Sequence, residues 1–325
     1  MLFRNAIRLL IENFKSVYKI ALYKFVVTLV ASALCCALVL PELISIWESP
    51  VTLNLREGVG QFFSSLFSAD ASGLEQAKDT VLESLKKLGE LLSSKTLQIV
   101  LITIGCVVIY LIKRFVETLC YFTIGDTLND KMTTYAETPF FTAFVKNLGK
   151  ASVYALVYVP VVFLFDLVTF ALVCFILSYV PIMTALFLSM TLIVMLQALK
   201  LTVTGLWMPA MSADNVKLRK ALKGNDCAEK KQRWKIYSTY LISVYLIVIV
   251  NVISAICTFF SALLITVPLS FMLFICLQYV YYYTVKGKKY FITYEKIASN
   301  PDKGDREHFF EYIGETATEE DKETK

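Results

Sequence analysis

Histidine is almost missing from this chain, which contains only His308. The chain also lacks the patterns HExxH, GxSxG, GxGxxG and GxxxxGK followed by Ser or Thr, which mark common classes of enzyme and nucleotide-binding protein. A zinc site built on histidines and a histidine base beside a membrane nucleophile are therefore excluded. We expect no catalytic residues, no cofactor and no metal. The one enzymatic alternative is a carboxylate pair that the sequence does not identify.

Cysteine is absent from the longest polar stretch between apolar segments, residues 48–95. Most cysteines lie inside the apolar segments, where cysteine behaves as a small hydrophobic residue. The eight positions are Cys35, Cys36, Cys106, Cys120, Cys174, Cys227, Cys257 and Cys276. The sequence therefore predicts no disulfide framework.

Charged residues make up only 18% of the chain, whereas hydrophobic residues reach 57%. The hydrophobic excess is concentrated in nearly charge-free segments, which are Phe25–Pro41, Leu97–Ile112, Ala151–Val180, Ile182–Met208, Ile236–Phe260 and Leu263–Val285. A helix needs about 20 residues to cross a bilayer, and these segments lack the alternation of a membrane barrel. The sequence thus predicts an all-α integral membrane protein with six transmembrane helices, and it excludes a soluble globule.

The expected domains follow from these segments. We expect transmembrane helices at 25–47, 96–117, 151–178, 182–208, 236–260 and 263–285. The remaining parts are an amphipathic N-terminus at 1–24, an outer segment at 48–95, a connector at 118–150, a basic loop at 209–235 and a tail at 286–325. The acidic end of the tail has little to bury, so we expect it to be disordered. In the connector, Gly125 and Asp126 are interpreted as a helix cap.

Lysine and arginine gather at the N-terminus and after the second, fourth and sixth apolar segments. Because basic residues accumulate on the cytoplasmic side of a bacterial-type plasma membrane, both termini are expected in the cytoplasm. Contact with anionic inner-leaflet lipids explains the net charge of +5, so no nucleic acid partner is needed. The alternative for the basic loop is a phosphate or an acidic partner.

The outer segment contains an amphipathic pattern. Apolar residues recur at helical spacing, at Leu74, Val81, Leu85, Leu88 and Leu92. The apolar stretch FFSSLF lies upstream, and ADASG separates the two. We therefore expect an extracytoplasmic helical hairpin. It lies on the membrane surface or caps the bundle, or alternatively it is a lid or a docking site for a protein partner.

The apolar segments contain a small set of polar side chains near their midpoints. This polar midplane cluster comprises Asp166, Gln197, Lys200, Asn251 and Gln278. Lys200 is a candidate partner for Asp166, although the hairpin places it about nine Å nearer the cytoplasm. These groups either bond helices to one another or line a substrate or proton path.

Two functions remain open from the sequence. The first is a permease-like or transport-associated membrane protein with the polar midplane cluster around Asp166 at its centre. The second is a non-catalytic scaffold or complex subunit that binds partners through the outer hairpin and the basic inner loops. Transport predicts that Asp166, Gln197 and Asn251 converge on one solvated cavity, whereas a scaffold predicts a dry core.

Overall fold

The computed structural model describes residues 2–68, 71–223, 230–293 and 296–298. The expected disordered end of the tail, including His308, lies outside the described residues. The chain forms two compact units, one of Met1–Phe25 with Phe115–Lys325 and one of Val26–Arg114.

Six helical segments in the described part of the chain are long and apolar enough to cross a membrane. They are α2 (Phe14–Trp47), α5 (Thr96–Thr134), α6 (Phe140–Tyr179), α7 (Ile182–Thr204) with α8 (Trp207–Ala213), α10 (Lys230–Cys257) and α11 (Leu263–Lys286). Several of these helices are longer than their apolar segments, since α2 begins in the basic N-terminus and α5 runs into the expected connector. The chain is therefore a polytopic membrane protein whose helices contact lipid.

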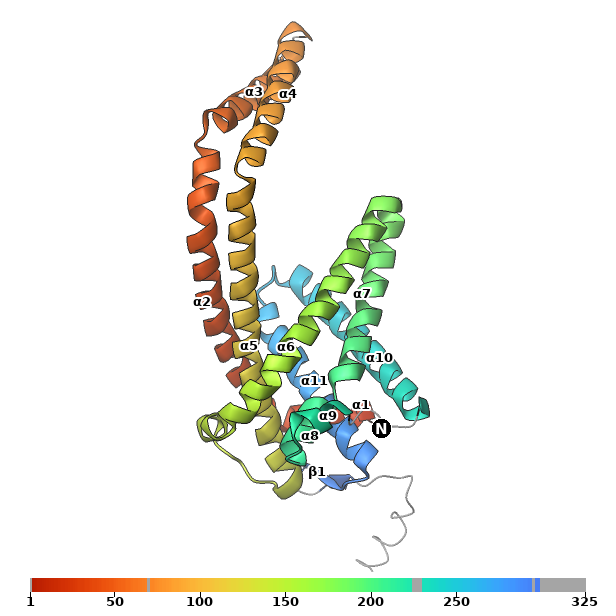
Figure 1. The fold of residues 1–325 in the computed structure, drawn as a ribbon. Helices are drawn as coiled ribbons and strands as arrows, with labels where there is room; N and C mark the ends of the chain where they lie inside the picture. The colour runs from red at the N-terminus through yellow and green to blue at the C-terminus, as the bar shows by residue number, and fades with distance from the viewer. Residues whose placement is uncertain (1, 69–70, 224–229, 294–295, 299–325) are drawn as a thin grey trace, which may run out of the picture. The chain divides into compact units, whose positions relative to one another are not determined.

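The unit Val26–Arg114 is a helical hairpin (Figure 1). It contains most of α2, then α3 (Pro50–Phe67), α4 (Ala71–Ser94) and the first part of α5. The side chain of Ser49 caps α3 by accepting from the Thr52 amide, and Pro50 occupies the first helical turn, where no amide is needed. Lys95 Nζ lies 3.0 Å from Glu42 Oε2, which ties the start of α5 to α2.

Helices α3 and α4 lie side by side (Figure 1). Among the described side chains of α4, Ala77 and Ser84 are the buried ones, and a Cβ at Gly58 of α3 would lie 3.2 Å from Val81 Cγ2. Small residues therefore set the close approach of the two helices. The predicted apolar stripe is only partly packed, because Leu85 and Leu92 remain 49% and 38% exposed. The side chain of Leu74 lies outside the described residues.

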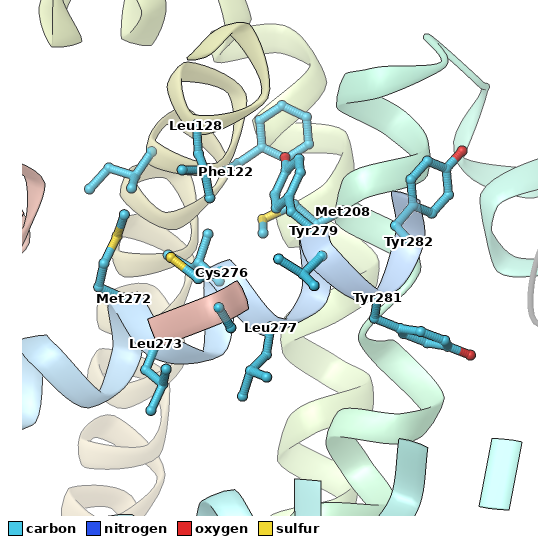
Figure 2. Packing of buried hydrophobic residues seen from close by; sticks show 14 of the residues in the cluster. Phe122, Leu128, Met208, Met272, Leu273, Cys276, Leu277, Tyr279, Tyr281 and Tyr282 are labelled. Carbon is cyan, nitrogen blue, oxygen red and sulfur yellow. The ribbon is translucent and has the colours of Figure 1, made fainter. Parts of the chain in front are cut away.

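The unit of Met1–Phe25 with Phe115–Lys325 is built around α11, which is the most buried of the six spans in the described part of the chain. Helix α1 (Leu2–Glu12) packs on α11 and buries Ala6 and Leu9. Helix α8 also packs on α11, and α9 (Leu218–Lys223) contacts α8. This places the core at the C-terminal half of α11, with Phe122 of α5 and Met208 of α8 beside Tyr279 (Figure 2).

Two tight turns join the last four spans. Residues 180–181 connect α6 to α7, and residues 258–262 connect α10 to α11. In the second turn Phe259 and Phe260 adopt φ values of 47° and 69°, which is the left-handed region. Pairs α6–α7, α7–α10 and α10–α11 are in contact, so these helices pack in chain order.

A short β-hairpin follows α11, and the expectation of an all-α chain misses it. Strand β1 (Tyr290–Thr293) pairs antiparallel with β2 (Lys296–Ala298). Gly287 caps α11 directly after its last residue, Lys286, with a φ of 66° that glycine adopts without strain. Tyr290 is buried, and its hydroxyl accepts a hydrogen bond from Asn5 Nδ2 at 3.1 Å. The hairpin is therefore fastened to α1.

Candidate functional site

Asp166 on α6 and Lys200 on α7 form an ion pair within the membrane-spanning segments. Lys200 Nζ lies 2.9 Å from Asp166 Oδ1, and Gln197 Nε2 donates to the same oxygen over 3.4 Å. The difference in depth estimated from the sequence does not separate the charges, because helical side chains lean toward the N-terminus of their own helix. In this antiparallel hairpin the two side chains therefore lean toward each other.

The ion pair is mostly covered by the chain. The side chain of Lys200 is 12% exposed, and that of Asp166 is 25% exposed. An unpaired charge in the middle of a membrane segment is costly, so the opposite charge and the amide of Gln197 both stabilise the carboxylate. The two charges thus neutralise each other, and a quarter of the Asp166 side chain remains exposed.

Asn251 forms a different contact, between α10 and α11. Its Nδ2 donates to Ile247 O at 3.0 Å and to Ser270 Oγ at 3.3 Å. Its Oδ1 is buried and has no hydrogen-bond partner among the described residues. The structure therefore brings Asp166, Gln197 and Lys200 together, and it pairs Asn251 with Ser270. Of the three residues whose convergence transport predicts, only Asp166 and Gln197 meet in the contacts between described residues.

Gln278 lies in the buried half of α11 and is 8% exposed. Its Cγ lies 3.6 Å from the place that a Cβ would take at Gly205, directly after α7. The hydroxyl of Tyr240 lies 2.9 Å from that same position. Gln278 is thus part of the packed junction between α7, α10 and α11.

A set of tyrosine hydrogen bonds on α11 was not predicted from the sequence. Tyr283 donates to Asn129 Oδ1 at 2.7 Å, and Tyr279 shares a hydrogen bond with Ser212. Tyr282 donates to Asp214, which also accepts from Lys288. In the sequence these tyrosines form the run YVYYY, whose composition indicates an apolar helix segment but not the hydrogen-bond partners of the hydroxyl groups.

Asp214 lies directly after α8, and the pKa of its carboxyl group is shifted. Burial by itself raises the pKa of this carboxyl, but the hydrogen bonds from Lys288 and Tyr282 outweigh burial, and the pKa falls below its usual range. The ionised form is favoured because both donors bond to the charged carboxylate. Asp214 therefore acts as an anionic anchor between α8 and the end of α11.

Gly125 and Asp126 do not cap a helix, because both lie inside α5. A Cβ at Gly125 would lie 2.7 Å from the Tyr279 hydroxyl, so glycine here permits the close approach of α11. Asp126 Oδ2 accepts from Asn147 Nδ2 at 2.5 Å, which links α5 to α6. The prediction of a cap was wrong because the helix continues through the polar residues, which bond to neighbouring elements.

Glu117 is a further acidic residue that the sequence did not single out. It lies on α5 and is 3% exposed. On the neighbouring turn of α2, Tyr23 donates to Val116 O at 3.0 Å, and Lys24 Nζ lies 3.3 Å from the Phe271 ring centroid. The basic end of the N-terminal segment is therefore packed into the unit at this level.

A pocket of about 400 Å³ lies between the start of α2, the end of α5 and residues 135–139. Its polar lining includes Lys15, Lys19, Lys131, Ser16, Thr127 and Thr138. Glu12 and Glu137 also line it. The sequence could not reveal this pocket, because its walls come from segments more than 100 residues apart.

Neither the arrangement of possible metal ligands nor comparison with known proteins points to another site in the described part of the chain. Within residues that the structure describes, no three His, Cys, Asp or Glu side chains are grouped so that they could hold a metal ion. No protein-family model, curated protein or solved structure matches the chain.

Proposed function

We propose that this chain is a permease-like protein of a bacterial-type plasma membrane, with the Asp166–Lys200 ion pair as its polar centre. The observation that carries the proposal is a pair of opposite charges 2.9 Å apart on facing helices of an apolar hairpin. Both termini would lie in the cytoplasm, and the protein would have no catalytic activity of its own.

Packing alone does not require a charged pair at this place. Neutral hydrogen bonds join membrane helices, and Asn251 with Ser270 is such a contact in the same chain. An ion pair is expensive to desolvate, and apolar residues of similar volume often stabilise a protein at least as well. Ionisable residues inside membrane segments commonly mark a path for an ion, a proton or a substrate. The charged pair on α6 and α7 fits that role better than a purely structural one.

The proposed action is competition for the Asp166 carboxylate. A proton or a cation that binds the carboxylate weakens its attraction for the Lys200 ammonium group. Gln197 bonds the same carboxylate oxygen and would remain as a neutral contact. Ligand binding would thus favour a conformation in which α6 and α7 are less tightly joined, as expected when a ligand binds two states with different affinity.

Water access to this place tests the proposal without knowledge of the substrate. Gln197→Cys leaves both charges of the pair in place, and Leu199→Cys is the matched control on the same helix, where the Leu199 side chain is 41% exposed on the surface of the chain. Each variant is made in a chain whose native cysteines are replaced by alanine. A charged, membrane-impermeant thiosulfonate is then added to protein in lipid nanodiscs.

Transport predicts modification at position 197 and none at position 199, since thiolates react only where water reaches them. Equal resistance at both positions would identify a dry, structural contact and would overturn the proposal. Modification at both positions would show that α7 is not embedded in lipid, which would also overturn it.

The second candidate function is a scaffold that assembles through the outer hairpin. Helix α4 exposes Leu82 at 55%, and Leu85 and Leu92 follow it on the same face. The helix also carries interspersed acidic and basic residues, including the Glu83–Lys87 pair at 2.7 Å. A mixed charge pattern beside an apolar stripe is self-complementary, so the expected occupant of this face is a second copy of the chain.

A further inference from the structure

The pocket at the start of α2 has a defined wall formed by residues 135–139. Helix α5 ends at Thr134, and Tyr135 adopts a φ of 55°, which turns the chain away from the helix axis. The Tyr135 hydroxyl donates to Glu12 Oε1 at 2.8 Å. This bond fastens residues 135–139 to the end of α1, so the pocket is built from tertiary contacts.

The lysines that line the pocket differ in whether an acidic side chain balances their charge. Lys131 Nζ lies 3.6 Å from Glu137 Oε1 and 5.5 Å from the Tyr135 ring centroid. Lys15 and Lys19 are exposed, and within the described ranges neither has an ion-pair partner. They lie four residues apart on one face of α2, where like charges repel each other. The α2 wall therefore presents two ammonium groups that an anion would stabilise.

The hydroxyl groups of the lining differ in what they can donate. Thr127 already donates to Ile124 O at 2.9 Å, and Thr138 donates to Asp130 Oδ2 at 2.7 Å. The Ser16 side chain lies between the two lysines in the sequence and also lines the pocket. The available donors are therefore concentrated on α2, as expected for a ligand that carries oxygen acceptors such as phosphate.

The surface of α2 continues from the two lysines into an apolar stripe. Tyr18 is 60% exposed, Leu22 is 69% exposed and Phe25 is 56% exposed. Their spacing of three to four residues places them along one side of the helix, next to Lys15 and Lys19. A basic pocket whose lysines lie beside an apolar helix face at the start of a span suits a lipid whose headgroup is anionic.

We propose that this pocket binds the phosphate headgroup of an anionic phospholipid, with Lys15 and Lys19 as the main contacts and the acyl chains along Tyr18, Leu22 and Phe25. The volume of about 400 Å³ is within the usual range for small-molecule sites, about 300–1,000 Å³. Phosphate is the shared chemistry of a lipid headgroup and a soluble phosphate compound. The apolar stripe favours the lipid.

Native mass spectrometry of the full chain in detergent tests this site. The probes are phosphatidylglycerol, phosphatidylcholine of the same chain length and inorganic phosphate. The pocket variant is Lys15→Gln with Lys19→Gln. The control is Lys217→Gln with Lys220→Gln, which removes two exposed lysines from the basic loop. A thermal unfolding curve for each variant verifies folding, and Lys15→Arg with Lys19→Arg keeps the charges if the glutamines disturb the helix.

The pocket variant is expected to lose roughly thirtyfold in phosphatidylglycerol affinity, because each lysine near an anionic lipid raises the affinity about fivefold. The control and the arginine variant should retain wild-type affinity. An equal loss in the control would mean non-specific attraction and would overturn the site. Binding of inorganic phosphate as strong as that of the lipid would overturn the lipid assignment. Because none of these residues touches Asp166, the result is independent of the proposed transport function.

Discussion

Lys200 Nζ lies 2.9 Å from Asp166 Oδ1 across the α6–α7 hairpin, which makes the two side chains an ion pair. We expect the two residues to be energetically coupled. In a double-mutant cycle of Asp166→Asn and Lys200→Gln, the coupling energy should be about 1–2 kcal/mol, within the range for contacting residues. Unfolding in detergent by SDS titration provides the four free energies.

The control for this cycle is the neutral contact between Asn251 and Ser270. Asn251→Ala and Ser270→Ala should show a coupling of about 0.6 kcal/mol, the average for hydrogen bonds between membrane helices. Purely additive effects of the Asp166 and Lys200 variants would contradict the ion pair.

Gly125 should not tolerate a larger residue. A Cβ at this position would lie 2.7 Å from the Tyr279 hydroxyl and 3.0 Å from Met208 Cε, and Tyr279 is fully buried. Gly125→Ala is therefore expected to lower the free energy of unfolding by about 1–3 kcal/mol through overpacking. The matched control is Gly149→Ala on α6, where a Cβ meets no atom within 4 Å. That variant should gain up to about 1 kcal/mol from helix propensity, and a loss as large as that of Gly125→Ala would refute the packing argument.

The Asp214 carboxyl should make stability depend on pH. Its folded-state pKa is lowered, so its contribution is present above the unfolded pKa of about 3.9 and is lost as pH falls through the folded pKa. The free energy of unfolding of the wild type should therefore exceed that of Asp214→Asn at neutral pH, and the difference should shrink below about pH 4. Unfolding titrations of both proteins from neutral to acidic pH measure it. A constant difference across that range would exclude the anchor role, and Glu90→Gln on the exposed side of α4 controls for the loss of a charge.

The predicted orientation places α4 outside the cell and α9 inside it. Glu90→Cys and Lys220→Cys, each in a chain without native cysteines, introduce exposed thiols at these two helices. In intact cells an impermeant maleimide should modify position 90, and it should modify position 220 only after permeabilisation. The reverse pattern would mean that the topology is inverted.

Self-association through α4 is the prediction of the scaffold alternative. Leu82→Glu with Leu85→Glu places charges on the exposed apolar face and should convert a dimer into a monomer if that face joins two copies. Size-exclusion chromatography with light scattering on detergent-solubilised protein reports the mass. Glu83→Gln, on the same helix and outside the apolar face, is the control. A monomeric wild type would remove this alternative.

Much of the architecture followed from the sequence because the bilayer imposes a simple rule. Apolar segments of spanning length must be helical, since every backbone group in lipid needs an internal partner. The six spans and the tight turns before α7 and α11 were therefore predictable. The helix α4 was predictable for a different reason, because its apolar residues recur at helical spacing. Helix ends were less predictable, because α2 and α5 continue into polar sequence that tertiary contacts support.

Side-chain partners were the part that the sequence could not supply. Depth along a helix suggested one level for Asp166, Gln197 and Asn251, but helix rotation directs Asn251 toward Ser270 instead. Counting residues along a helix gives the depth of each Cα but ignores the direction of the side chain. Because helical side chains point toward the N-terminus of their own helix, Lys200 reaches Asp166.

The sequence by itself determined that this is a multi-span helical membrane protein, because hydrophobicity and segment length act locally along the chain. Only the tertiary structure decided which polar groups meet. The Asp166–Lys200 pair depends on the antiparallel packing of two helices, and the basic pocket requires the start of α2 and the end of α5 to fold together. Contacts of this kind join residues that are distant in sequence, and no local pattern encodes them.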